Sequence, residues 1–177
     1  MSSDELTLFS YMVLGLVGRD GAGPYDLQRM AKQGRMYDWA GESQYYVEPK
    51  RLAKLGYLEA RKEPGRTRER TVYTLTEKGH EALREWARTP VRFPRLEHEG
   101  LVRMLITDLV GEAAVRESIG TLRADIADLA ARLDIAEAIA ETLPHRRKYL
   151  LLGHRLGRRL LETHLEWLDE VERELRS

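Results

Sequence analysis

Eight basic side chains gather in one short stretch of the sequence, residues 43–73. They are Lys50, Arg51, Lys54, Arg61, Lys62, Arg66, Arg68 and Arg70, and with four glutamates they give the stretch a net charge of +4 in a chain that is neutral overall. Lysine and arginine bind phosphate groups, and arginine also donates paired hydrogen bonds to the edges of bases. The stretch therefore has the composition of a nucleic-acid contact surface.

These residues divide between a predicted helix and a predicted hairpin. The helix runs from Ser43, a good N-cap residue, to about Leu55, and Gly56 ends it. Alternating residues predict strands over 57–62 and 70–75, and Pro64-Gly65 fits the centre of a type II turn. A helix that can enter a DNA groove, followed by a hairpin with arginines at its tip, is typical of a winged helix.

The sequence leaves two properties of this helix open: its path around Pro49, and which of two tyrosines is buried. Pro49 would lie inside it, where proline costs roughly 3 kcal/mol. Either the helix is kinked, or its regular part begins near Glu48 with Pro49 in the first turn. Tyr45 and Tyr46 lie at its N-terminal end, and one of them is expected in the core without the sequence saying which.

The flanking residues complete a first domain over residues 1–89. Helical spacing of apolar residues predicts helices over 6–18 and 25–32, and Thr76 is the expected cap of a helix over 77–87 that buries Trp86. Two prolines, Pro90 and Pro94, then mark a connection, so we place the domain boundary there.

The second domain, residues 95–177, is predicted to be entirely helical. A short helix over 96–110 precedes a heptad pattern from Val115 to Leu143, which predicts one helix of about 31 residues, roughly 46 Å long. Pro144 ends it, and a last helix follows from His145. We expect this coiled-coil-like domain to form a homodimer through Ile119, Leu122, Ile126, Leu129, Leu133, Leu161, Leu165 and Leu168. The basic residues 146–148 either pair with acids such as Glu141 or extend the DNA contact surface.

The sequence gives no residue-level support for catalysis. The absence of cysteine excludes disulfides and thiolate metal sites, and the five histidines show no metal-binding spacing. No glycine-rich phosphate loop is present, so we expect no enzyme activity, no cofactor and no metal. The longest uncharged run has 13 residues, too few to span a bilayer, and acids precede it, so we predict a cytoplasmic protein.

Several short motifs recur in an order and spacing that resemble the PadR-type transcriptional regulators of prokaryotes. They are Tyr25-Asp26-Leu27, Ser43-Gln44-Tyr45-Tyr46, Lys50-Arg51-Leu52, Leu55-Gly56-Tyr57-Leu58 and the run Tyr73–Gly79 leading to Trp86. The C-terminal half is similar to the longer-tailed members, which dimerise through helices. Two positions depart from the pattern: Pro49 replaces an aliphatic residue, and Gly23-Pro24 replaces a glycine directly before Tyr25.

The resemblance implies a mainly α fold with a small β-hairpin wing and a homodimeric repressor that binds a palindromic operator. The residues that it places on DNA are Tyr25, Ser43, Gln44, Tyr45, Tyr46, Lys50, Arg51, Lys54, Arg66, Arg68 and Arg70, with Tyr46 favoured over Tyr45. It also implies release by a small aromatic effector near Trp39 and Trp167, although both tryptophans are also typical packing residues. The alternative is a winged-helix and coiled-coil module that binds proteins without specific DNA binding.

Overall fold

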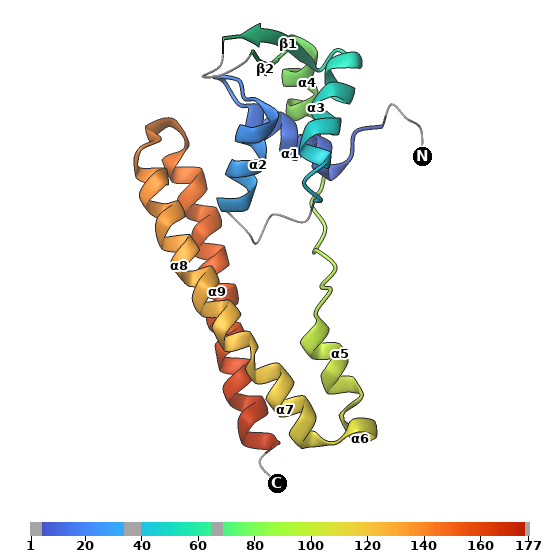
Figure 1. The fold of residues 1–177 in the computed structure, drawn as a ribbon, viewed down its shortest axis with the longest axis vertical. Coiled ribbons are helices and arrows are strands. Elements are labelled where there is room, and N and C mark those ends of the chain that lie inside the picture. Colours follow the sequence, from blue (N-terminus) through green and yellow to red (C-terminus); the bar gives the residue numbers. More distant parts are fainter. Residues whose placement is uncertain (1–4, 34–39, 65–68, 176–177) are drawn as a thin grey trace. The chain divides into compact units, whose positions relative to one another are not determined.

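The computed structural model describes residues 5–33, 40–64 and 69–175. Within these ranges, residues up to Lys32 and from 40 to Arg92 form one compact unit, and residues from Phe93 onward form a second (Figure 1). No helix in the described part of the chain has both the length and the apolar character needed to cross a membrane.

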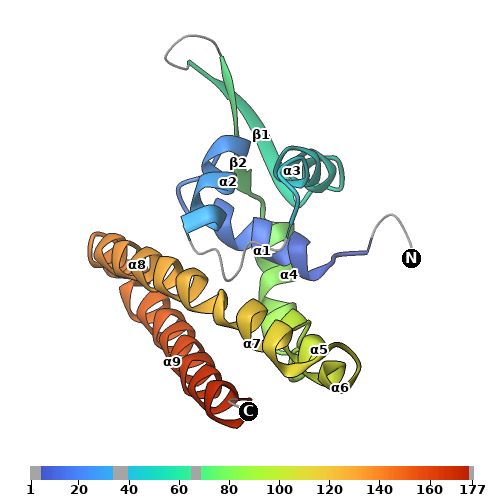
Figure 2. The same ribbon diagram turned by 60° about the horizontal axis from the view of Figure 1, so that its bottom comes forward.

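The first unit has the element order of a winged helix-turn-helix. Its elements are α1 (Leu8–Val17), α2 (Pro24–Gln33), α3 (Gln44–Lys54), β1 (Leu58–Glu63), β2 (Arg70–Leu75) and α4 (Glu77–Ala87). The two strands are antiparallel, with Leu58 opposite Leu75 and Glu63 opposite Arg70. In Figure 2 this hairpin extends beyond the neighbouring helices.

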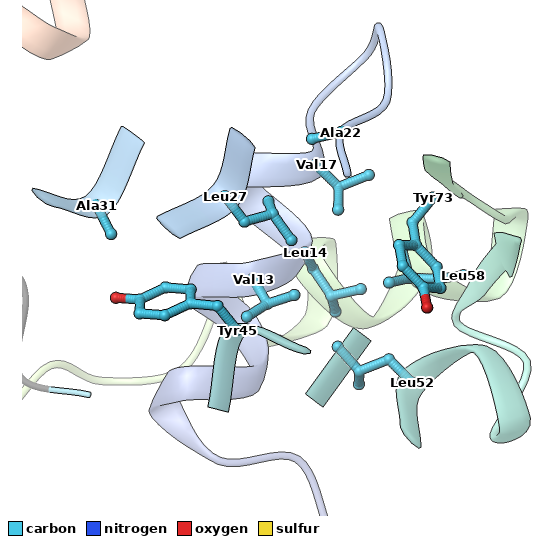
Figure 3. Close-up of a cluster of buried hydrophobic side chains, with 10 residues drawn as sticks. All are labelled: Val13, Leu14, Val17, Ala22, Leu27, Ala31, Tyr45, Leu52, Leu58 and Tyr73. Carbon is cyan, nitrogen blue, oxygen red and sulfur yellow. The ribbon is translucent and has the colours of Figure 1, made fainter. Parts of the chain in front are cut away.

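The core of this unit surrounds α1. Val13, Leu14 and Val17 of α1 are buried against side chains of α2, α3 and the hairpin (Figure 3). Tyr45 belongs to this core: it is 1% exposed and meets the ring of Phe9 edge-on at 5.3 Å between centroids. Tyr46 is 42% exposed. The structure therefore assigns Tyr45 to packing and leaves Tyr46 on the surface.

The loop before α2 is attached to the hairpin. Ala22 forms an isolated bridge with Tyr73, with hydrogen bonds of 3.0 Å in both directions. The preceding Gly21 has φ +77°, and a Cβ there would lie 2.8 Å from the Tyr73 carbonyl oxygen. Glycine is required because only it combines this φ with so close an approach. The bridge fixes the start of α2 beside the wing.

Helix α3 contains Pro49 in its interior, and Pro49 is buried. The helix begins at Gln44, so the alternative in which its regular part starts near Glu48 is wrong. Ser43 has helical φ and ψ and makes no side-chain cap hydrogen bond, which corrects the predicted cap. A backbone hydrogen bond precedes the helix instead: the Gln44 amide donates to the Gly41 carbonyl at 2.9 Å. The cap predicted at Thr76 is confirmed, because its hydroxyl accepts from the Gly79 amide at 3.1 Å.

The second unit consists of helices only in its described part. They are α5 (Glu99–Leu105), α6 (Thr107–Val110), α7 (Glu112–Gly120), α8 (Leu122–Glu141) and α9 (Pro144–Glu174). Helices α8 and α9 run side by side as an antiparallel hairpin, and α5 and α6 lie near α7 at the end of the unit that holds the C-terminal half of α9 (Figure 1).

Two predicted helices are divided in the structure. The single helix expected from Val115 to Leu143 is α7 followed by α8, separated at Thr121. Gly120 is a poor helix former, and the Thr121 hydroxyl donates to the Ser118 carbonyl at 2.7 Å, a back-bond that bends helices. The helix expected over 96–110 begins at Glu99 and is divided at Ile106. The 31-residue helix is α9.

The leucine and isoleucine residues predicted to join two chains lie inside one chain. Ile119, Ile126, Leu133, Leu161 and Leu168 are buried in a single cluster, and the partly buried Leu122, Leu129 and Leu165 pack against it. The heptad pattern is therefore satisfied by the packing of α7 and α8 on α9. These residues are thus packed within one chain, and their place in a surface between two chains stays a prediction.

Candidate nucleic-acid interface

Helix α3 has one buried face and one exposed face. Tyr45, Pro49 and Leu52 are buried, whereas residues three or four positions apart on the other side face solvent: Ser43, Tyr46, Val47, Lys50 and Lys54. Because positions at this spacing share one side of a helix, they form a continuous outer face. This is the face that a recognition helix presents to a DNA groove.

The two lysines of this face are available for phosphates. Among the described residues, neither Lys50 nor Lys54 forms a salt bridge, and both side chains are exposed. Tyr46 offers a hydroxyl and a ring edge beside them. Val47 is 62% exposed and was missed by the sequence analysis. Val47 lies four residues after Ser43 and three before Lys50, and this spacing could have predicted that it shares their face of the helix. Apolar side chains at such sites contact the methyl group of thymine.

Arg51 differs from its neighbours because its guanidinium is held inside the unit. Its Nε donates to Glu48 Oε2 at 2.9 Å, and its Nη2 donates to Glu48 Oε1 at 2.8 Å and to Ser10 Oγ at 3.1 Å. Ser10 is fully buried and donates to Glu48 Oε1 at 2.7 Å. The network joins α3 to α1. Arg51 therefore fixes the recognition helix in place, a role that the sequence analysis did not assign.

The network also sets the ionisation of Glu48. Burial by itself raises the pKa of this carboxyl group, but hydrogen bonds from Arg51 and Ser10 and the charge of Arg51 outweigh burial. The pKa of Glu48 is consequently lower than its ordinary value of 4.5. At neutral pH the pair is fully ionised, which leaves Arg51 bound to its partner.

A second exposed group lies at the start of α2. Tyr25 is 65% exposed, and Arg29 follows one turn later. Asp26 lies between Arg29, at 3.3 Å, and Arg70 of β2, at 3.6 Å. Arg70 also pairs with Glu63 at 3.3 Å and keeps more than half of its side-chain surface exposed. Arg70 thus lies where β2 begins, with its charge partly balanced by two acids.

The remaining predicted site residues fall into three groups. Gln44 is exposed in the first turn of α3 beside Ser43. Arg66, Arg68 and Trp39, with Gly65 of the predicted turn, lie outside the described residues.

Trp167 contacts α5: its ring meets that of His98 edge-on at 5.3 Å, so it contributes to packing. Trp86, expected to be buried, stacks on Tyr11 at 4.5 Å and stays 40% exposed.

Comparison with known proteins finds relatives along the full length of the chain. The negative transcriptional regulator PadR of Bacillus subtilis (strain 168) is 23% identical in an alignment that covers 94% of this chain and 96% of that protein. The crystal structure of Bacillus subtilis PadR in complex with operator DNA matches with a TM-score of 0.73 and 22% identity, covering 96% of this chain and 99% of that one. The chain is thus similar to PadR along nearly all of its length and has the fold of PadR.

Other structures agree with this PadR-family fold. Bacillus subtilis PadR in complex with p-coumaric acid matches with a TM-score of 0.67 and 22% identity, covering 97% of this chain and all of that one. The Vibrio cholerae virulence activator AphA matches with a TM-score of 0.73 and 22% identity, covering 94% and 96% of the two chains. No protein-family model matches the sequence. The winged helix-turn-helix with a helical C-terminal unit, predicted from the sequence, is confirmed.

Proposed function

We propose that this chain is a regulator of the PadR family, a sequence-specific DNA-binding protein that acts as a homodimeric repressor at a palindromic operator in the cytoplasm. The observation that carries the proposal is the outer face of α3. Tyr46, Val47, Lys50 and Lys54 face solvent there, and the buried face of the same helix is fixed to α1 by core packing and by the Arg51 network. A rigid helix with free cations and base-sized side chains is suited to groove recognition.

The homodimer follows from the symmetry of an operator. Two recognition helices related by a two-fold axis meet equivalent half-sites about 34–36 Å apart, one turn of DNA, or at a multiple of that spacing. The crystal structure of the Bacillus subtilis relative in complex with operator DNA supports operator binding by the present chain. Arg66 and Arg68 then supply contacts from the hairpin, and Tyr25 and Arg29 contacts from α2.

Release by a small aromatic effector is part of the same proposal. It is supported by the relative that was crystallised with p-coumaric acid, a phenolic acid. Such a ligand changes DNA affinity only if it binds one spacing of the two recognition helices more tightly than the other. Trp39 and Trp167 remain the residues proposed to contact it, the second of them beside the His98 ring.

The proposal is tested by measuring the affinity of the protein for the promoter region next to its own gene. We expect Lys50→Ala combined with Lys54→Ala to weaken binding and to reduce the slope of log K against log salt by about 4, because the dimer loses two lysines from each chain and each would neutralise about one phosphate. Arg84→Ala is the matched control, because Arg84 is exposed but paired with Glu77 and Glu81 in α4. Equal affinities for the double variant and the wild type would favour the protein-interaction module instead.

A further inference from the structure

The C-terminal end of helix α3 is joined to the first turn of α4. Leu55 is the C-cap of α3, and Gly56 and Tyr57 lead from it into β1. Carbonyl groups at the end of a helix have no partner within the helix and need donors from elsewhere. In this structure the carbonyl oxygens of Leu55, Gly56 and Tyr57 all accept hydrogen bonds from the beginning of α4.

Two residues supply these three hydrogen bonds. Lys78 Nζ donates to the Leu55 carbonyl oxygen at 2.7 Å. The Thr76 hydroxyl donates to the Gly56 carbonyl at 2.7 Å, and the Thr76 amide donates to the Tyr57 carbonyl at 3.2 Å. Thr76 is also the N-cap of α4, so the residue that begins α4 satisfies the backbone that follows α3. The end of one helix and the start of the other therefore form one hydrogen-bonded unit.

The backbones of the two segments are also in close contact at Gly79. Gly79 is buried in the first turn of α4, and a Cβ at this position would lie 2.3 Å from the Tyr57 carbonyl oxygen. That distance is too short for any side chain, so only glycine lets α4 approach the end of α3 this closely. The junction thus depends on the backbone as well as on exposed side chains.

Lys78 brings a positive charge to this junction. Its Nζ lies 4.3 Å from the centroid of the Tyr57 ring, within the range of a cation–π interaction. The macrodipole also places partial negative charge at the C-terminus of α3, where a cation is favourable. Lys50 and Lys54 face solvent, whereas the ammonium group of Lys78 is bound to the end of the helix that carries them.

We propose that Lys78 is a positioning residue for DNA recognition, which holds the last turn of α3 in the place where its outer face reads the operator. Lys54 directly precedes Leu55, so loosening of this turn would displace a cation of that face. Arg51 fixes α3 to α1, and Lys78 fixes its C-terminal end to α4. The inference rests on the proposed function and adds a residue that acts through α3 without contacting DNA.

A positioning lysine and a phosphate-binding lysine differ in what their removal changes. Loss of a phosphate contact weakens binding to every duplex and reduces the dependence of affinity on salt. Loss of position weakens the base contacts, which only the operator provides, and leaves the number of neutralised phosphates unchanged. The affinity for promoter DNA relative to unrelated DNA therefore separates the two roles.

Lys78→Met in the full chain tests the proposal, because methionine keeps an unbranched apolar stem but has neither the charge nor the donor. We expect affinity for the promoter duplex to fall by about three- to tenfold, since the favourable contact with the helix end is lost in both chains of the dimer. Affinity for an unrelated duplex and the salt slope should stay unchanged. Arg84→Met is the matched control, because Arg84 is an exposed cation of α4 that pairs with Glu77 and Glu81.

Two results with DNA would overturn the proposal. Equal promoter affinity of Lys78→Met and wild type would show that this contact has no part in recognition. A smaller salt slope, with both duplexes weakened alike, would show that Lys78 itself binds phosphate. A wild type that fails to discriminate the promoter from unrelated DNA would instead contradict the proposed function, and the two failures are thus distinguishable.

Amide hydrogen exchange tests the contact without DNA. The amides of Leu55, Gly56 and Tyr57 donate to carbonyl groups in the last turn of α3. Their exchange should be faster in Lys78→Met than in wild type or Arg84→Met, while the amides of α1 exchange at the same rate in all three proteins. Unchanged exchange at residues 55–57 would show that Lys78 does not hold the end of α3, and faster exchange in α1 as well would show a general loss of stability. Either result would overturn the proposal.

Discussion

Neighbouring residues of α3 with the same charge have different surroundings. Lys50 faces solvent, whereas Arg51 donates to Glu48 and to the buried Ser10. The difference arises because position 51 lies one residue closer to the buried face that contains Leu52. A sequence shows the charge of both residues but not the serine of α1 that meets one of them, 41 positions earlier.

This difference predicts two separable phenotypes. Arg51→Ala should lower the free energy of unfolding by about 1–3 kcal/mol, because it leaves the largely buried carboxylate of Glu48 without its charge partner and with only the hydrogen bond from Ser10. Lys50→Ala should change it by less than about 0.5 kcal/mol, as is usual for an exposed residue, and should weaken DNA binding. Urea unfolding of both variants measures the first effect. A stable Arg51→Ala protein would return Arg51 to the residues expected on DNA.

The choice between Tyr45 and Tyr46 has the same origin. Both are aromatic and both lie in the first turn of α3, so neither residue type nor spacing shows which of them is buried. The ring of Phe9 decides between them by receiving Tyr45 edge-on. Val47 was overlooked because an exposed valine in a helix has no local signal beyond its distance from Ser43 and Lys50.

At the scale of elements, hydrophobic periodicity predicted the helices of both units and the hairpin. The points at which two of the predicted helices are interrupted, Thr121 and Ile106, were harder to predict. The heptad pattern continues through Gly120 and Thr121, and only the backbone hydrogen bond of the Thr121 hydroxyl marks the bend between α7 and α8. The pattern also shows that a seam exists but not whether its partner lies in the same chain, so the seam residues were expected between two chains.

The α8–α9 hairpin contains a histidine that should make its stability depend on pH. His154 Nδ1 is buried and has no hydrogen-bond partner in the described structure. Burial lowers the pKa of His154, Arg158 lowers it further, and Glu137 opposes them in part. Because the folded-state pKa lies below the unfolded value of about 6.5, this contribution to stability is complete above pH 6.5 and is lost as the pH falls below it.

The prediction is tested by comparing the unfolding free energy of wild type and His154→Leu at pH 7.5 and pH 5.5. The wild type should lose stability relative to the variant as the pH falls. His145→Gln, a change at an exposed histidine of the same helix, serves as the control and should follow the wild type. A wild type and His154→Leu that respond equally to acid would show that His154 is not the titrating group.

At the scale of the whole molecule, net charge is a poor guide and the distribution of charge is a good one. The chain is neutral, yet the outer face of α3 is cationic and α9 has a basic half and an acidic half. The cationic face of α3 fits DNA as its partner. The sequence contains both patterns, but the structure is needed to show which charges are already paired within the chain.

The central claim, that the outer face of α3 binds an operator through phosphates and bases, is tested most directly by the salt dependence of binding. Affinity for the promoter duplex should be measured between 50 and 200 mM salt, beside a duplex of the same length with unrelated sequence. If six to ten phosphates are contacted by the dimer, affinity should fall by about 10³–10⁵ over this range. The promoter should bind more tightly than the unrelated duplex at every salt concentration. An affinity independent of salt, or equal for both duplexes, would contradict the claim.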